Sequence, residues 1–327
     1  MATHDEGPGD LPARSWRAVV RRTAREALDD ELPDRAAALT YYGVLSVFPA
    51  LLLMVASLGV AGESVTRSLL DGLGQLAPGP ARDLLSGAVR QLRGAGTASG
   101  LMAVVGLAAA VWSASGYVAA FIRTANVVYD LPEGRPVWKL TPLRIGLTLL
   151  LMVLLAASSV IVVFTGPLAR RAGDAIGVGQ EAVALWGVAK WPVLVVLVAL
   201  VVGLLYWRAP NVRGPGLRWL GPGSVAAVLL WLLASGGFAL YAANFGSYNK
   251  TYGTLAGVVV FLVWLWLSNL AVLLGLELNA ELARQRAIRA GLPATEEPYV
   301  EPRDTRTWPA VLRGRVARRA RLRRKAL

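Results

Sequence analysis

Six long apolar segments run through this 327-residue chain, at approximately residues 36–60, 99–122, 143–166, 183–206, 222–243 and 253–278. Each has the length of about 20 residues or more that a helix needs to cross the hydrocarbon core of a bilayer. The segments are apolar on all sides, unlike the one-sided helices that surround a soluble core. Because a helix satisfies its own backbone hydrogen bonds in lipid, the sequence predicts an all-α integral membrane protein with six transmembrane helices.

The amino-acid composition excludes several classes of protein function. Charged residues make up 17% of the chain, against about 25% in a typical soluble protein. Cysteine is absent, which excludes disulfides, thiol catalysis and cysteine-ligated metals. The single histidine, His4, lies in a polar N-terminal segment, so a histidine-based metal site or catalytic triad is not expected. We therefore expect a protein that is not an enzyme and that uses no metal or cofactor.

Lysine and arginine are distributed unevenly between the two sides of the predicted bundle. With six spans, both termini and the second and fourth connections share one side, which carries 26 basic residues against 7 on the other. Basic connections are retained in the cytoplasm. The first ten residues are polar and acidic, without the apolar core of a signal peptide. We therefore expect a multi-pass protein of the bacterial cytoplasmic (inner) membrane with both termini in the cytoplasm.

Two segments near the spans show helical amphipathicity. Within a cytoplasmic segment (1–33), SWRAVVRRTAREALDDEL (15–32) has an apolar face and an arginine-rich face, which predicts an N-terminal interfacial helix. A solvated linker helix is the alternative. Residues 61–98 of the membrane domain (34–283) contain two amphipathic stretches separated by PGP at 78–80. They predict an external helical hairpin between the first two transmembrane helices.

Residues 284–327 are strongly basic, and we expect a largely disordered cytoplasmic tail. The stretch EEPYVEPRDTRTWP, from Glu296 on, is too polar and rich in proline to pack. The 13 basic residues of the tail should attract anionic headgroups, each contributing about 1 kcal/mol near the surface. Membrane lipids are therefore the expected partners, no specific nucleic acid is expected, and homo-oligomerisation is left open.

Three stretches resemble the YihY/BrkB family of bacterial inner-membrane proteins. They are DRAAALTYYGVLSVFPALLLMVASLG (34–59), APNVR (209–213) followed by PG at 222–223, and NFGSYNKTYGTLAGVVVFLVWLWLSNLAVLLGLELNAEL (244–282). The resemblance runs from about residue 24 to 284 and implies a six-helix membrane protein without a defined reaction. Some members have carried the name ribonuclease BN, widely regarded as a misassignment, and others a virulence-factor label.

The ribonuclease name does not fit the residues of this chain. Metal-dependent RNA cleavage needs clusters of histidine and aspartate, or paired carboxylates, to hold ions and activate water. The acidic residues are scattered through connections, apart from Glu277 and Glu281, and most tryptophans lie in or beside spans. RNA recognition would favour aromatic platforms beside basic grooves. We therefore expect no ribonuclease activity.

Glu277 and Glu281 lie one helical turn apart at the end of the sixth span, so they share a face. They are candidates for a cytoplasmic gate or ion relay; the alternative is a structural role, in ion pairs with Arg284 or Arg123. Asn269 lies two turns deeper, about 12 Å from Glu277 by helix rise. It could contact a ligand or make an interhelical hydrogen bond.

Lys190 is the one basic residue well inside a predicted span. Charged residues inside a membrane are costly and mark functional sites by default. Since Lys190 lies about seven residues from the outer end of its helix, it could also extend its ammonium to the interface beside Trp191. The sequence leaves both interpretations open.

The polar stretch NFGSYNKTYG (244–253) separates the fifth and sixth spans. A tight external turn explains its glycines and one tyrosine, but not its asparagines. We expect Asn244, Tyr248 and Asn249 to line the outer mouth of a cavity and to face Lys190, which would attract an anionic or zwitterionic ligand.

Two functions follow from these features. The first is a transporter or permease-like protein for a lipid or a small polar solute, supported by polar residues and prolines within spans. The second is a non-transporting envelope scaffold or lipid-binding protein, in which the surface helix and basic tail recruit partners or anionic lipid. The substrate cannot be identified from the sequence.

Overall fold

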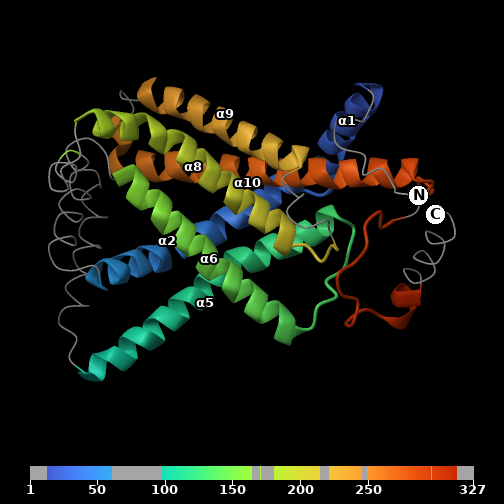
Figure 1. Ribbon diagram of the computed structural model, residues 1–327, viewed down its shortest axis with the longest axis horizontal. Coiled ribbons are helices and arrows are strands. Elements are labelled where there is room, and N and C mark those ends of the chain that lie inside the picture. Colours follow the sequence, from blue (N-terminus) through green and yellow to red (C-terminus); the bar gives the residue numbers. More distant parts are fainter. Residues whose placement is uncertain are drawn as a thin grey trace. The chain divides into compact units, whose positions relative to one another are not determined.

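The computed structural model describes residues 13–60, 97–163, 170, 180–213, 221–244, 249–295 and 297–314. Their helices are α1 (Ala13–Asp29), α2 (Leu32–Val60), α5 (Thr97–Val128), α6 (Val137–Val163), α8 (Gln180–Arg208), α9 (Pro222–Asn244) and α10 (Asn249–Arg289) (Figure 1). Among the described residues, the only other pairing is an isolated bridge between Val212 and Pro302. The predicted all-α class is therefore confirmed.

Four helices in the described part of the chain are long and apolar enough to cross a membrane. They are Val137–Val162 of α6, Val183–Arg208 of α8, Pro222–Tyr241 of α9 and Gly257–Arg289 of α10. Large apolar side chains are exposed along them, among them Val153, Leu155, Val188, Leu233 and Leu240. Apolar surface of this extent requires an apolar solvent, which a bilayer provides.

The other two predicted spans coincide with α2 and α5, helices of 29 and 32 residues. The side chains of residues 47–60 and 97–107 lie outside the description. The total of six spans therefore stays a prediction. The predicted external hairpin lies outside the described residues over 61–96.

The chain divides into two compact units. The first unit contains residues 1–41, 119–143 and 202–327, and the second contains residues 42–118 and 144–201. Within the second unit, the hydroxyl of Ser46 in α2 hydrogen-bonds to the carbonyl of Ala114 in α5 (3.3 Å). The Arg144 guanidinium of α6 lies 4.5 Å from the ring centroid of Trp112 in α5, a cation–π contact.

In the first unit, α9 begins directly against α10 because two glycines let the backbones meet (Figure 1). A Cβ atom on Gly223 would lie 2.2 Å from the carbonyl oxygen of Gly275, and one on Gly275 would lie 2.4 Å from that of Gly223. The N–H of Gly223 donates to Asn279 Oδ1 at 3.0 Å. The Tyr206 hydroxyl donates to the carbonyl of Val272, which fixes the end of α8 to the same helix.

Helix α1 also packs on α10. Val19 and Leu282 are buried against each other, with Trp16 and Leu278 around them. On the other side of α1, Val20 and Leu28 are exposed. The predicted helix is present, but the residues expected on one apolar face are divided between buried Val19 and exposed Val20 and Leu28. Its location on a membrane surface stays a prediction.

Three helices of the first unit are followed by a residue whose backbone has a positive φ angle, in the left-handed region. These residues are Glu31 (φ 54°) after α1, Asp130 (φ 51°) after α5 and Gly291 (φ 93°) after α10. The last two turns close with bonds from Leu131 N–H to Asn126 O and from Leu292 N–H to Ala287 O. Glycine adopts this conformation freely, whereas Glu31 and Asp130 adopt it at some cost in backbone energy.

The structure differs from the expected disordered tail over residues 284–314. Helix α10 continues to Arg289, and the segment that follows makes specific hydrogen bonds to two connections of the first unit. We call residues 297–314 the C-terminal strap. Residues 315–327, the most basic part of the predicted tail, lie outside the described residues.

Candidate functional site

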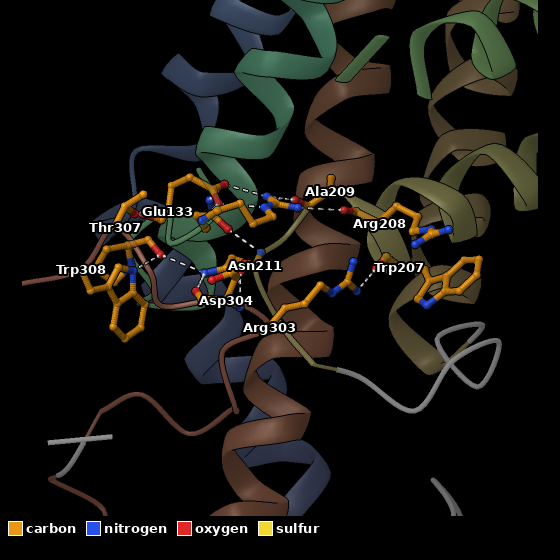
Figure 2. Close-up of polar contacts among 12 residues, drawn as sticks. Glu133, Trp207, Arg208, Ala209, Asn211, Arg303, Asp304, Thr307 and Trp308 are labelled. Carbon is orange, nitrogen blue, oxygen red and sulfur yellow. Dashed lines mark hydrogen bonds and ion pairs between the residues drawn. The ribbon is translucent and has the colours of Figure 1, made fainter. Parts of the chain in front are cut away.

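Two polar clusters lie in the first unit, and the first is centred on Asn211 in the connection between α8 and α9. Asn211 is fully buried. Its side-chain amide donates to the Asp304 carbonyl (2.7 Å), and its Oδ1 accepts from the Asp304 N–H (3.0 Å), as Figure 2 shows. Its backbone N–H donates to Asn126 Oδ1 at 2.7 Å. Asn211 therefore links the strap to the end of α5. Its side chain forms two hydrogen bonds to the backbone of Asp304, as the backbone of a neighbouring β-strand would.

Arg135, in the connection between α5 and α6, extends this cluster. Its guanidinium donates to both carboxylate oxygens of Glu133 (2.7 and 2.6 Å) and to the carbonyl of Ala209 (2.7 Å). Burial raises the pKa of Glu133, but the hydrogen bonds from Arg135 outweigh it and hold that pKa below its usual value. Arg303 of the strap donates to the Trp207 carbonyl at 2.8 Å (Figure 2). Carbonyls at the C-terminal end of α8 are thus capped by two arginines.

The strap makes three further contacts, two to the α5–α6 connection and one to the first turn of α6. Trp308 Nε1 donates to the Pro132 carbonyl (3.1 Å), Thr307 Oγ1 donates to the Glu133 carbonyl (2.9 Å), and Lys139 forms an ion pair with Asp304 (2.9 Å). These contacts are all made between groups of the protein itself. The Asn211 cluster is therefore a structural clasp.

The second cluster surrounds the two predicted glutamates of α10. Glu281 forms an ion pair with Arg22 of α1 at 3.0 Å, and Arg22 also pairs with Glu26 one turn along α1. Arg284 lies 3.9 Å from Glu281. Of the two pairing residues that the sequence suggested, Arg284 is a distant partner, while the close partner, Arg22, was not predicted.

Glu277 lies deeper and differs from Glu281. It is 1% exposed, and its Oε2 has no hydrogen-bond partner. The carboxyl group of Asp30, in the turn between α1 and α2, is within electrostatic reach of Glu277. Tyr129, after α5, is within electrostatic reach of Glu277. We call Glu26, Asp30, Asp130, Glu277 and Glu281 the acidic cluster.

Asn269 is buried between α10 and α2. Its amide donates to Thr40 Oγ1 at 3.1 Å, and that hydroxyl donates to the Ala36 carbonyl at 2.8 Å. Nearby, Trp266 Nε1 donates to the Pro33 carbonyl at 3.0 Å. These bonds favour the interhelical interpretation of Asn269, and they fasten the first turns of α2 to α10.

The remaining predicted site residues are Lys190, Asn244, Tyr248 and Asn249. Lys190 is buried in the second unit, with its ammonium 5.2 Å from the ring centroid of Trp191. Tyr248 and the side chains of Asn244 and Asn249 lie outside the described residues. The outer cavity, its ligand and both interpretations of Lys190 therefore stay predictions.

Sequence spacing could have found only part of the acidic cluster. Arg22 and Glu26 are four residues apart on an amphipathic helix, which is a recognisable ion-pair spacing. Asp30 belongs to a run of acidic residues after that helix, but nothing in the spacing indicates that it reaches a residue some 250 positions away. Within the described residues, no group of three acidic or histidine side chains is arranged to hold a metal ion.

Comparisons with known proteins agree on a membrane family. A family model described as Virulence factor BrkB matches residues 23–299. The Bacillus subtilis protein YfkH, whose name describes it as ribonuclease-like, is 30% identical over 265 residues, which are 81% of this chain and 93% of that protein. A UPF0761 membrane protein of Xanthomonas campestris is 30% identical over 83% of this chain, and one of Xanthomonas oryzae is 31% identical over 80%.

The chain spans 64% and 60% of the length of those two Xanthomonas relatives. No solved structure matches the chain significantly.

Proposed function

Because the chain belongs to the Virulence factor BrkB family of bacterial membrane proteins, we propose that it is a transporter for a lipid or a small polar solute. The observation that carries this proposal is Glu277, a buried carboxyl group with an unpartnered oxygen on a helix long enough to cross a membrane. Ionisable groups in such positions are costly, and they typically mark pathways for ions or substrates.

The geometry around Glu277 supports a moving part rather than a passive support. Within the described residues, two hydrogen bonds join α2 to α10, from Asn269 to Thr40 and from Trp266 to the Pro33 carbonyl. Polar interhelical bonds of this kind contribute about 1 kcal/mol each in membranes, so they can break and re-form during a transport cycle. The Asn211 clasp, in contrast, holds the connections of the same unit rigidly.

The rival function is an envelope scaffold or lipid-binding protein without transport. It is favoured by α1, where Val20 and Leu28 are exposed beside Arg17, Arg21 and Arg25. An apolar stripe flanked by arginines suits a surface of anionic lipid. Both functions place the protein in the bacterial cytoplasmic membrane, with its termini in the cytoplasm and lipids as partners, and neither makes it a nuclease.

Reconstitution in lipid vesicles tests the proposal. The purified chain should move fluorescent lipid analogues or labelled polar solutes faster than protein-free vesicles do. Glu277→Gln should abolish that movement, because it removes the buried charge and keeps the shape. Glu181→Gln is the matched control, since Glu181 is exposed in the first turn of α8.

Two outcomes would contradict the proposal. One is movement by Glu277→Gln at the wild-type rate. The other is the absence of movement for every lipid and solute offered, together with tight binding to anionic vesicles, which would support the scaffold.

A further inference from the structure

Two arginines from distant parts of the chain meet at Trp207, near the end of α8. The Arg208 guanidinium lies 4.5 Å from the centroid of the Trp207 ring, and Arg303 Nη2 donates to the Trp207 carbonyl at 2.8 Å (Figure 2). Arg208 is the last residue of α8, whereas Arg303 is brought there by the strap. A bond from the Arg303 N–H to the Asn211 carbonyl (2.8 Å) fixes the backbone at that point.

Neither arginine has a carboxylate partner within the described residues. Arg208 is exposed, and Arg303 is half-buried. A guanidinium group has several N–H donors and no acceptor. Arg303 uses Nη2 on the Trp207 carbonyl, and Arg208 faces an aromatic ring. Both side chains therefore keep donors for an anion that comes from outside the chain.

Glu133 does not neutralise this positive charge, because Arg135 donates to both of its carboxylate oxygens at 2.7 and 2.6 Å. Burial, followed by the charges of Arg135 and Arg208, lowers the pKa of Arg303 despite the opposing charge of Glu133. The positive charges thus dominate around Arg303, and such a place favours a bound anion.

The end of α8 lies at the depth of lipid headgroups when this helix crosses a bilayer. Its apolar span, Val183–Arg208, has 26 residues. At 1.5 Å per residue it is roughly 39 Å long, which exceeds the hydrocarbon core of about 30 Å and stays within the full bilayer of about 40–45 Å. Tryptophan and arginine at the end of a span are typical of this boundary. The phosphate of a phospholipid is therefore the anion available to the two arginines.

The charge of the site selects among phospholipids. Guanidinium groups match the oxygens of a phosphate, to which they donate in pairs. A zwitterionic headgroup also carries a cation, which two arginines repel, whereas the headgroup of phosphatidylglycerol carries the phosphate charge alone.

We propose that Arg208 and Arg303, with Trp207 between them, form a binding site for the phosphate group of an anionic phospholipid. A lipid bound to both arginines joins the strap to the end of α8, in addition to the bonds that the strap makes with Asn211. Binding at this site does not depend on transport, so its failure would leave the proposed function untouched.

Native mass spectrometry of the full-length protein, released from neutral detergent micelles, tests the site. The wild type should bind a first molecule of phosphatidylglycerol more tightly than one of phosphatidylcholine. Arg208→Gln and Arg303→Gln should each weaken that first binding step roughly fivefold or more. Arg306→Gln is the matched control, because it removes an exposed arginine of the same strap. It should weaken the binding by less than about twofold, as a screened charge outside the site would.

Three results would overturn the proposal. The first is equal affinity of the wild type for the two lipids, and the second is wild-type affinity in Arg208→Gln. The third is displacement of phosphatidylglycerol by an equal concentration of inorganic phosphate, which would show a site for a free anion instead of a lipid. Arg208→Gln keeps the test open even where Arg303→Gln loosens the strap, because the described contact of the Arg208 side chain is with the Trp207 ring alone.

A second measurement tests whether the lipid holds the strap. Added phosphatidylglycerol should slow protease cleavage of residues 297–314 in the wild type but not in Arg208→Gln. Cleavage of the wild type at the same rate with and without the lipid would overturn the proposed link between the strap and α8.

Discussion

Asn211 and Glu277 are both fully enclosed polar side chains, but the protein satisfies them to different degrees. The side chain of Asn211 has partners for both its donor and its acceptor groups within the strap and the α5–α6 connection. Glu277 keeps one carboxylate oxygen without a partner. A satisfied buried network confers rigidity, whereas an unsatisfied group stores free energy that a change of state can release. We therefore assign Asn211 a structural role and keep Glu277 as a candidate functional residue.

Asn211→Ala should release the strap. The substitution leaves the backbone groups of Asp304 and Pro132 without their partner in a buried place, and each unsatisfied group costs about 1–3 kcal/mol. We expect a loss of roughly 2 kcal/mol in the free energy of unfolding, and cleavage of residues 297–314 by added protease. Arg306→Ala is the control, because the exposed Arg306 side chain lies 3.8 Å from the Asp304 carboxylate and the backbone N–H of residue 306 keeps its own bond to that carboxylate. Equal protease resistance of the two variants would show that Asn211 is not the clasp.

Asp130 should make stability depend on pH. Below about pH 4 it is protonated in both the folded and the unfolded chain and has no effect. As the pH rises, the unfolded chain ionises first, because the pKa of the folded chain is raised to about 7. Stability should therefore fall as the pH rises towards about 7, by a small amount because Asp130 is exposed and water screens its neighbours.

Asp130→Asn tests this dependence, since asparagine accepts the left-handed backbone at this position. Its unfolding temperature should match that of the wild type near pH 4 and exceed it near pH 8. The same difference at both pH values would point to a backbone effect instead of a titration.

At the scale of elements, the crossing of α9 and α10 depends on the absence of side chains at Gly223 and Gly275. A methyl group on Gly275 would lie 2.5 Å from Ala227 Cβ and 2.7 Å from the Tyr206 hydroxyl, besides the backbone of α9. None of these atoms belongs to the flexible end of a long side chain. The two helices must therefore separate to accept it.

Gly275→Ala should consequently destabilise the first unit by about 1–3 kcal/mol, the usual cost of overpacking. Gly257→Ala on the same helix is the matched control, because no atom lies within 4 Å of a Cβ placed there. It should leave stability unchanged or raise it by up to about 1 kcal/mol through helix propensity. Thermal unfolding in detergent, followed by near-ultraviolet circular dichroism, measures both. A tolerated Gly275→Ala would show that α9 and α10 are not closely packed there.

The elements of this fold were largely predictable, and the contacts between them were not. Long apolar runs predicted α6, α8, α9 and α10 because lipid imposes both their length and their helical state. The sequence did not predict the strap. The prolines and charged residues of 297–314 indicated a segment that does not pack against the rest of the protein. Its backbone groups are instead satisfied by Asn211 and Glu133, partners far away in the sequence. Glu277 was predicted from its chemistry, whereas Asp30 emerged only from the turn that brings it there.

At the scale of the whole molecule, one family of membrane proteins accounts for residues 23–299, and the candidate site lies inside that range. The clasp joins residues before α6 to residues after α10, so the first unit holds together segments from the beginning, middle and end of the chain. The clasp therefore fastens the strap to segments far away from it in the sequence.

The proposed orientation can be tested throughout the chain, because the sequence contains no cysteine and each introduced thiol is therefore unique. We expect Lys139→Cys and Arg306→Cys to react with a membrane-impermeant thiol reagent only after the cells are opened. Arg82→Cys, in the predicted external hairpin, should react in intact cells. Six spans place these positions on opposite sides, whereas five spans would place Arg306 outside. Labelling of Arg306→Cys in intact cells would therefore contradict both the six-span topology and the cytoplasmic location of the acidic cluster.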